Sequence, residues 1–107
     1  MSNERMTAEK FKEALDEGRR NFGEITVEGV LNLETATLRY LDLEGATLEH
    51  LNLSSATLGS LNISNATLGY LNMRNATFGY LNLNNITVEE IYFEGMSILN
   101  ESVVNQD

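Results

Sequence analysis

Apolar and polar positions follow a five-residue period along most of the chain. The unit repeats almost without interruption from Leu31 to Leu99, for example in LNISN ATLGY LNMRN ATFGY. Its first and third positions are apolar and its second is polar, which is the alternation of a strand with one buried face. The fourth and fifth positions hold polar residues, Gly or Tyr, and carry turn chemistry. The period therefore predicts a repeat architecture in which each unit is a short strand followed by a corner.

Two kinds of unit alternate, one beginning Leu-Asn and the other Ala-Thr. A chain that turns after every unit coils on itself, and 20 residues per coil place like units on like. Asn52 then stacks on Asn72 and Thr47 on Thr67, and such polar ladders are favourable between stacked strands. We therefore expect an all-β solenoid, a quadrilateral (four-sided) β-helix of about four coils.

The corners differ between the two kinds of unit. The fifth positions of the Leu-Asn units are mostly Gly and Asn, which predicts a positive φ there. The Ala-Thr units have residues such as Tyr40 and Tyr70 at this position, so a second type of corner is expected. All third-position side chains are predicted to point inward, including those of Leu38, Leu83 and Phe93. A filled interior leaves no room for a buried cofactor, and we expect none.

The N-terminal residues have a different pattern. Thr7 to Gly18 read as a short amphipathic helix with Phe11 and Leu15 on one face, and we expect this α-helix to cap the first coil. The register slips by one residue near Glu28 to Val30, which predicts a bulge. The expected organisation is an N-terminal segment over residues 1–21, the repeat over 22–104 and a tail over 105–107.

The units ATLRY, ATLEH, ATLGS and ATLGY resemble the pentapeptide repeat, usually written A-(D/N)-L-x-x. The resemblance extends from Leu31 to about Val104, and the segment before it is similar to the family's N-terminal helix and basic-Asn-Phe step. Membership would imply a right-handed, four-sided β-helix, and the handedness comes from the resemblance alone. Half of the second positions are Thr instead of Asp or Asn, which makes the surface less acidic than the motif implies.

The net charge of the chain indicates which kinds of partner it can bind. The net charge is −9, from 16 acidic against 7 basic residues, and this argues against direct nucleic-acid binding. Some pentapeptide-repeat proteins mimic the DNA duplex and act on gyrase or other type II topoisomerases. A mimic needs charge along its whole length, but no acidic residue occurs between His50 and Val88. The first hypothesis is therefore a non-catalytic scaffold or protein-interaction module, and a DNA-mimicking modulator of DNA gyrase or topoisomerase IV is the alternative.

The sequence does not favour an enzyme. His50 is the only histidine, it falls at an outward corner, and the chain has no Cys. The carboxylates are too few in any one ladder to form a ligand set for a metal ion. No catalytic, metal-binding or cofactor-binding residue is predicted. The chain shows no apolar run long enough to span a membrane and no apolar signal segment, so a cytoplasmic location is expected.

Exposed tyrosines and acidic residues are the best candidates for a partner surface, because Tyr is enriched at interfaces. Tyr40 and Tyr80 are expected on one side with Ser60 between them, and Tyr70 on the opposite side above His50. The candidate surface residues are Tyr40, Tyr70, Tyr80, Glu44, Glu49, Glu89 and Glu90.

The C-terminal end is rich in apolar residues, but little chain remains to cover them. An uncovered coil offers an apolar floor and an unpaired strand edge. We expect a homodimer through this end, and the rival is that the segment ESVVNQD folds back over its own last coil. The expected interface comprises Tyr92, Phe93, Met96, Ile98, Leu99, Val103 and Val104.

Overall fold

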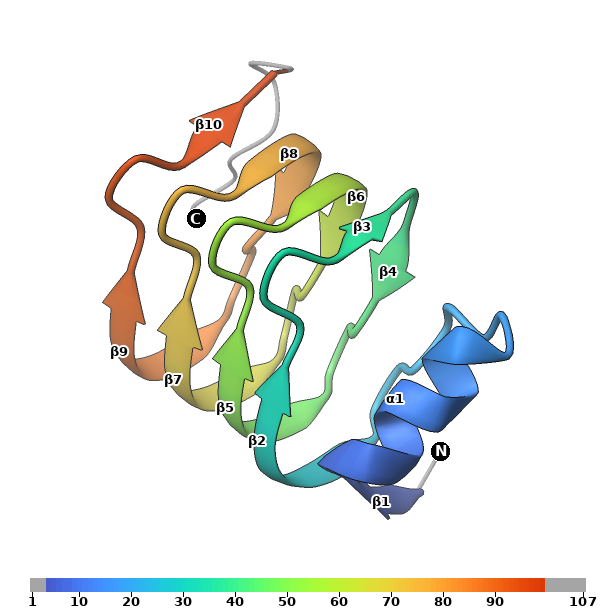
Figure 1. The fold of residues 1–107 in the computed structure, drawn as a ribbon. Coiled ribbons are helices and arrows are strands. Elements are labelled where there is room, and N and C mark those ends of the chain that lie inside the picture. Colours follow the sequence, from blue (N-terminus) through green and yellow to red (C-terminus); the bar gives the residue numbers. More distant parts are fainter. Residues whose placement is uncertain (1–3, 100–107) are drawn as a thin grey trace.

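A computed structural model describes residues 4–99 of the chain. They form a parallel β-solenoid of about five turns with one short helix at the N-terminus (Figure 1). The elements in chain order are β1 (Arg5–Thr7), α1 (Ala8–Asp16), β2 (Thr26–Asn32), β3 (Thr37–Leu38), β4 (Leu41–Asp42), β5 (Thr47–Asn52), β6 (Thr57–Asn62), β7 (Thr67–Asn72), β8 (Thr77–Asn82), β9 (Thr87–Tyr92) and β10 (Ser97–Ile98).

The expected count of about four coils was too low. The expected repeat began at residue 22, whereas sheet A already begins at β1, Arg5–Thr7. The strand β1, which the sequence pattern did not predict, pairs in parallel with β2 and extends the same sheet. The N-terminal segment therefore contributes backbone pairing to the solenoid as well as its helix.

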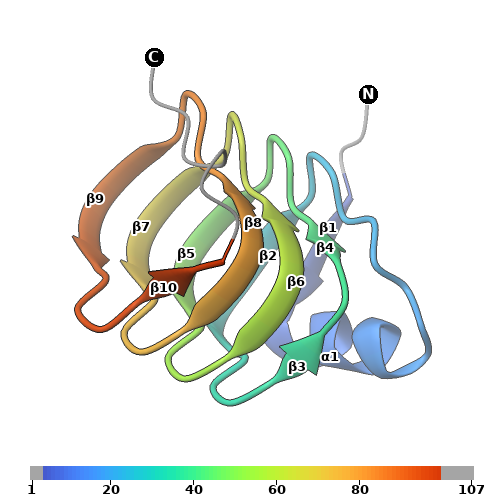
Figure 2. The same ribbon diagram turned by 90° about the horizontal axis from the view of Figure 1, so that it is seen from above.

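The strands form two parallel sheets. Sheet A has the order β1-β2-β5-β7-β9, and sheet B has the order β10-β8-β6-β3, with β4 also paired to β6. Neighbouring strands are offset by 20 residues beyond the bulge in β2, so that Thr47 pairs with Thr67 and Asn52 with Asn72. This register confirms the predicted stacking of like units on like. Figure 2 shows the strands stacked one behind another, with α1 at one end of the stack and β9 and β10 at the other.

The corners after the Leu-Asn units are turns with the predicted positive φ. The fifth position has a φ between 58° and 74° in every unit, at Thr35, Gly45, Ser55, Asn65, Asn75, Asn85 and Gly95. An Asn or Asp side chain at the second position supports every one of these turns except the last, where Tyr92 takes its place: the Asn52 Oδ1 accepts the N–H of Ser54 at 3.0 Å, and the Asn72 Oδ1 accepts that of Arg74 at 3.0 Å. Asn and Asp suit a position before a turn, because their side chains accept a backbone N–H two residues on.

The corners after the Ala-Thr units are not turns, so the expectation that every unit is a separate short strand is wrong there. The strands β5 to β9 each run for six residues from the Thr of one unit to the second position of the next. The chain bends at the fourth position, where the pairing between β5 and β7 passes from Leu68 to Tyr70. The backbones are close at this bend, since a Cβ atom added to Gly69 would lie 2.7 Å from the carbonyl oxygen of Glu49.

The core is a set of stacked apolar columns, and its least buried members lie at the column ends. Leu58 and Phe78 are buried in one column, but Leu38, which begins that column, is half-buried. Leu83 is the last described member of its column and is half-buried, and Phe93 is exposed at the end of another. The inward prediction thus holds for the middle of each column, where a side chain has a neighbour on both sides.

The helix α1 covers the N-terminal turn, as expected. The Thr7 side chain caps it by accepting the N–H of Lys10 at 3.2 Å. Phe11 is fully buried, and its ring stacks on that of Phe22 with 4.0 Å between the centroids. The predicted bulge in β2 is confirmed by a register shift between Val27 and Val30.

Candidate functional site

A ladder of aromatic side chains crosses the outer face of sheet A. It consists of His50 on β5, Tyr70 on β7 and Tyr92 on β9, and we call it the aromatic ladder. The ring centroids of His50 and Tyr70 are 4.6 Å apart, and those of Tyr70 and Tyr92 are 5.3 Å apart. The tilted rings are close enough for favourable aromatic contact. The expected placement of Tyr70 above His50 is confirmed, and Tyr92 joins them.

Charged groups surround the C-terminal end of the aromatic ladder. The guanidinium carbon of Arg74 lies 4.3 Å from the ring centroid of Tyr92, and the Arg74 Nε donates to Glu94 Oε1 at 2.7 Å. The Tyr92 hydroxyl donates to Glu90 Oε1 at 2.9 Å. Hydrogen bonding to Tyr70 and then to Glu90 raises the pKa of Tyr92 to about 12. The hydrogen bond from Arg74 lowers the pKa of Glu94.

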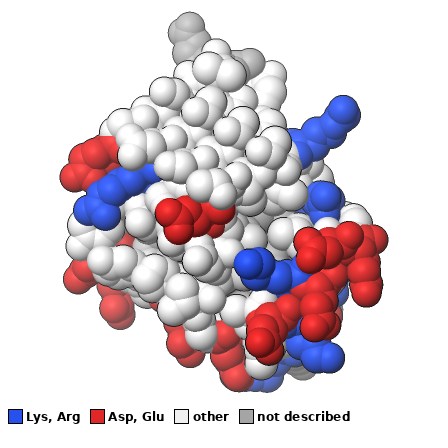
Figure 3. All heavy atoms as spheres, viewed as in Figure 1, with Lys and Arg blue, Asp and Glu red and all other residues white. Residues whose placement is uncertain are grey.

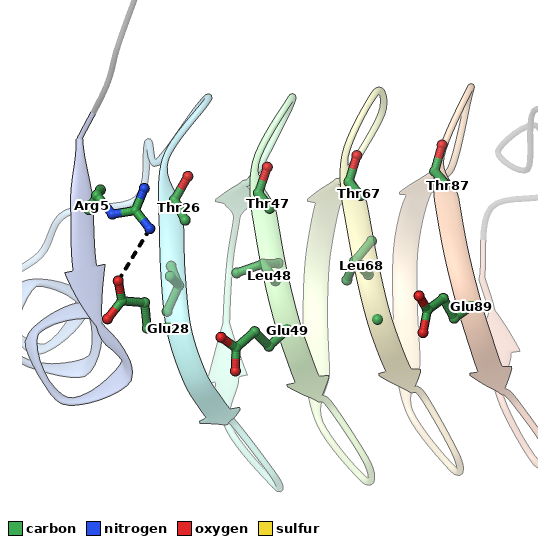
Figure 4. Close-up of a pocket in the computed structure, with 12 residues that line it drawn as sticks. Arg5, Thr26, Glu28, Thr47, Leu48, Glu49, Thr67, Leu68, Thr87 and Glu89 are labelled. Atoms are coloured by element: carbon green, nitrogen blue, oxygen red, sulfur yellow. Dashed lines mark hydrogen bonds and ion pairs between the residues drawn. The ribbon is translucent and has the colours of Figure 1, made fainter.

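A shallow groove of about 460 Å³ crosses sheet A (Figure 4). One wall is the threonine row, formed by Thr26, Thr47, Thr67 and Thr87. The other is the carboxylate row, formed by Glu28, Glu49 and Glu89. Gly69 occupies the position between Glu49 and Glu89 and leaves a gap in the second wall.

The predicted partner surface is divided between the two sheets. Sheet A carries Glu49, Glu89, Glu90 and Tyr70 on its strands β5, β7 and β9. Tyr80 lies on sheet B and pairs with Ser60 in the expected register. The other two predicted residues flank β4 of sheet B: Tyr40 immediately precedes this strand, and Glu44 lies in the turn after it.

Tyr40 is held by its own polar neighbours. Its hydroxyl lies 3.3 Å from Asn21 Oδ1 and 3.2 Å from Asp42 Oδ2. Desolvation, followed by the charge of Asp42, raises the pKa of this tyrosine. These contacts give Tyr40 a structural role at the N-terminal end of sheet B, away from the aromatic ladder.

The ion pair of Arg74 with Glu94 was not predicted from the sequence. The two side chains lie 2.7 Å apart, so their charges offset each other. The two residues are 20 positions apart, so the predicted period already places them on neighbouring turns. Arg5 was missed for another reason, because the strand that carries it has no repeat signal.

The C-terminal end of the described chain exposes apolar side chains. Phe93 is 55% exposed and Leu99 is 75% exposed. Met96 and Ile98 are partly buried against the core. Val103 and Val104, which complete the predicted dimer interface, lie outside the described residues.

Charge is distributed unevenly over the surface. In the view of Figure 3, acidic and basic side chains gather near α1, and a broad area above them is largely uncharged. The 20-residue turn brings acids together that are distant in sequence: Glu49 and Glu89 are two strands apart in sheet A, or about 10 Å at the usual strand spacing. The acid-free stretch of the sequence thus separates Glu49 from Glu89 by only two strand spacings.

Within residues 4–99, no group of three or more His, Cys, Asp and Glu side chains is placed to hold a metal ion. Over the same residues, no helix is long and apolar enough to cross a membrane. No protein-family model matches the chain, and comparisons with curated proteins and with solved structures gave no significant match. The resemblance to the pentapeptide repeat therefore rests on the repeated residues and on the solenoid they form.

Proposed function

We propose that this chain is a non-catalytic protein-interaction module that binds a basic partner through the outer face of sheet A. The observation that carries the proposal is that the aromatic ladder and three carboxylates, Glu49, Glu89 and Glu90, lie on neighbouring strands of sheet A, with Tyr92 hydrogen-bonded to Glu90. Aromatic groups supply contact area at interfaces, and charge complementarity guides association. The further proposal that the coil is a right-handed, four-sided pentapeptide-repeat β-helix is supported by the repeated ATLGY-type units and the 20-residue register.

Capture of partners from cells that make the protein tests this function. The wild type is compared with the face variant Glu49→Gln/Glu89→Gln/Glu90→Gln and with the control Glu34→Gln/Glu44→Gln, which removes charge from turns. We expect the face variant to lose the specific partners and the control to retain them. An unchanged set of partners for the face variant would refute the proposal, provided that circular dichroism shows all three proteins folded.

A DNA-mimicking modulator of a type II topoisomerase is the second candidate function. It is favoured by the single row that Glu28, Glu49 and Glu89 form along the solenoid. It is disfavoured by the gap at Gly69, since DNA carries its charge without interruption. We expect weak or no inhibition of gyrase supercoiling at low micromolar protein. Clear inhibition that disappears when Glu44, Glu49, Glu89 and Glu90 are neutralised would establish the mimic instead.

We also propose that two copies associate through their C-terminal ends. The exposure of Phe93 and Leu99 supports this, as does the end of both sheets at β9 and β10 within the described chain. Contact between two such ends would remove apolar surface from water and leave sheet A free to bind a partner.

A further inference from the structure

The groove on sheet A has walls of different chemistry. The threonine row supplies hydroxyl groups, and Thr47, Thr67 and Thr87 make no side-chain hydrogen bond within the described residues. The carboxylate row supplies negative charge about two residues further along each strand, which places the walls about 7 Å apart. Leu48 and Leu68 line the groove between these two walls. An occupant must therefore be narrow, carry positive charge on one side and offer polar groups to the other.

The groove already contains one guanidinium from the chain itself. Arg5 lines its N-terminal end, and the Arg5 Nη2 lies 3.3 Å from Glu28 Oε2. The Glu49 carboxylate accepts a single backbone N–H, that of Gly29, at 3.2 Å. The Glu89 carboxylate makes no hydrogen bond or ion pair within residues 4–99. Glu49 and Glu89 therefore retain the capacity to accept further donors of the kind that Glu28 accepts from Arg5.

The spacing of these two carboxylates selects the conformation of the occupant. Two strand intervals separate Glu49 from Glu89, or about 9.6 Å. A polyproline II segment advances about 9.3 Å in three residues and returns a side chain to the same face. A β-strand places side chains of one face about 6.6 Å or about 13 Å apart, which fits the carboxylates less well.

The remaining features suit the same conformation. A polyproline II backbone has no internal hydrogen bonds, so its carbonyl groups can accept from the free hydroxyls of the threonine row. Gly69 projects no side chain between the two carboxylates, which leaves space for the residues between the two basic ones.

We propose that this groove binds an extended segment of a partner protein in the polyproline II conformation, with arginines three residues apart paired to Glu49 and Glu89. The inference rests on the proposed protein-binding function and specifies the segment recognised. Arginine is preferred to lysine because its planar fork pairs with a carboxylate through two hydrogen bonds.

Fluorescence anisotropy with labelled peptides and the full chain tests the inference. The probe contains the sequence Arg-Pro-Pro-Arg, and an isomer of the same composition contains Arg-Pro-Arg-Pro. We expect the first peptide to bind about fivefold more tightly, because only its arginines reach both carboxylates. Glu49→Gln/Glu89→Gln should weaken it about tenfold, while Glu34→Gln/Glu44→Gln should change it less than about twofold. Thr67→Val, which keeps the side-chain shape, should weaken it by a smaller factor.

The outcomes separate this inference from the proposed function. Equal affinity for the two isomers, with loss in Glu49→Gln/Glu89→Gln, would overturn the polyproline II spacing and leave the acidic face as a binding surface. If both double variants weakened peptide binding equally, the peptide would be attracted by net charge alone. That result would overturn the proposal that the groove is the binding site. If neither peptide bound, while the wild type still captured partners that the face variant loses, the proposed role of the groove would also be overturned. The proposed protein-binding function would remain supported.

Discussion

The guanidinium of Arg74 lies over the ring of Tyr92, 4.3 Å from its centroid, and the same side chain pairs with Glu94 at 2.7 Å. Tyr92 replaces the Asn or Asp that supports the preceding turns. The contacts of Arg74 with Tyr92 and Glu94 therefore connect the turn after β9 to the turn after β7. The other turns have an Asn or Asp side chain at the position of Tyr92.

Arg74→Ala should loosen the last described turn. The N–H of Asn75 donates to the carbonyl of Glu94 at 2.9 Å, and this bond should open more often once the side-chain contacts are lost. Hydrogen exchange should be faster at the Asn75 amide and unchanged at Leu53, which pairs with Asn72 one turn earlier. Arg39→Ala is the control, because Arg39 makes no side-chain ion pair within the described chain. Unchanged exchange at Asn75 would contradict the role given to Arg74.

The raised pKa of Tyr92 predicts a loss of stability at alkaline pH. Neighbouring Tyr70 and Glu90 raise this pKa to about 12, whereas an unfolded tyrosine ionises near pH 10. The contribution of the protonated Tyr92 hydroxyl to the stability of the fold is therefore complete below about pH 10. It is lost as the pH rises from about 10 to about 12. Absorbance at alkaline pH should show a late tyrosine transition that disappears in Tyr92→Phe. A wild-type titration without any such late transition would show that the hydroxyl is not held as described.

The positive φ at Ser55 predicts opposite effects for two neighbouring substitutions. Ser55 has a φ of 58°, a conformation that costs about 1–2 kcal/mol for a residue with a Cβ and little for Gly. Ser55→Gly should therefore raise the free energy of unfolding by about 0.5–1 kcal/mol, since the entropy of the unfolded chain offsets part of the gain. Ser54→Gly, one residue earlier and without a positive φ, should lower it by about 0.5–1 kcal/mol. Urea denaturation measures both, and a loss of stability in Ser55→Gly would reject the explanation.

The period of the sequence was sufficient to predict features that recur at fixed positions. The 20-residue register, the positive φ at residues such as Asn65 and Gly45, and the bulge near Gly29 depend on local residue types and were predicted correctly. The strand β1 could not be predicted, because Arg5–Thr7 is stabilised by pairing with β2 and has no repeat signal of its own.

The candidate site was predicted less completely than the fold. The contact of His50 with Tyr70 follows from the period of the sequence. The groove could not be predicted, because it depends on the depth of the surface between the threonine row and the carboxylate row. Along the sequence Glu49 and Glu89 are 40 positions apart, but the coil brings them to within two strands of each other. Distances between surface groups in a solenoid must therefore be counted in turns.

Phe11→Ala should show whether α1 stabilises the solenoid as a cap. The Phe11 ring is fully buried and stacks on Phe22, so its removal should leave a cavity over the first turn. We expect the free energy of unfolding to fall by about 3–5 kcal/mol. Lys12→Ala, on the exposed side of the same helix, is the matched control and should be nearly neutral. If both variants unfolded at the same urea concentration as the wild type, the helix would contribute nothing as a cap.

Leu99→Glu should convert a C-terminal dimer to a monomer. Leu99 is 75% exposed at the end of the stack, and in the proposed dimer it would be buried against a second copy together with Phe93. A charge at this position would then be placed in an apolar interface without a partner, which association cannot tolerate. Val30→Glu is the matched control, because Val30 is 56% exposed on β2, near the opposite end of the solenoid. Sedimentation equilibrium should show a dimer for the wild type and for Val30→Glu and a monomer for Leu99→Glu, with circular dichroism showing that all three are folded. A wild type that remains monomeric at every concentration would refute the interface, and so would a dimer that Leu99→Glu leaves intact.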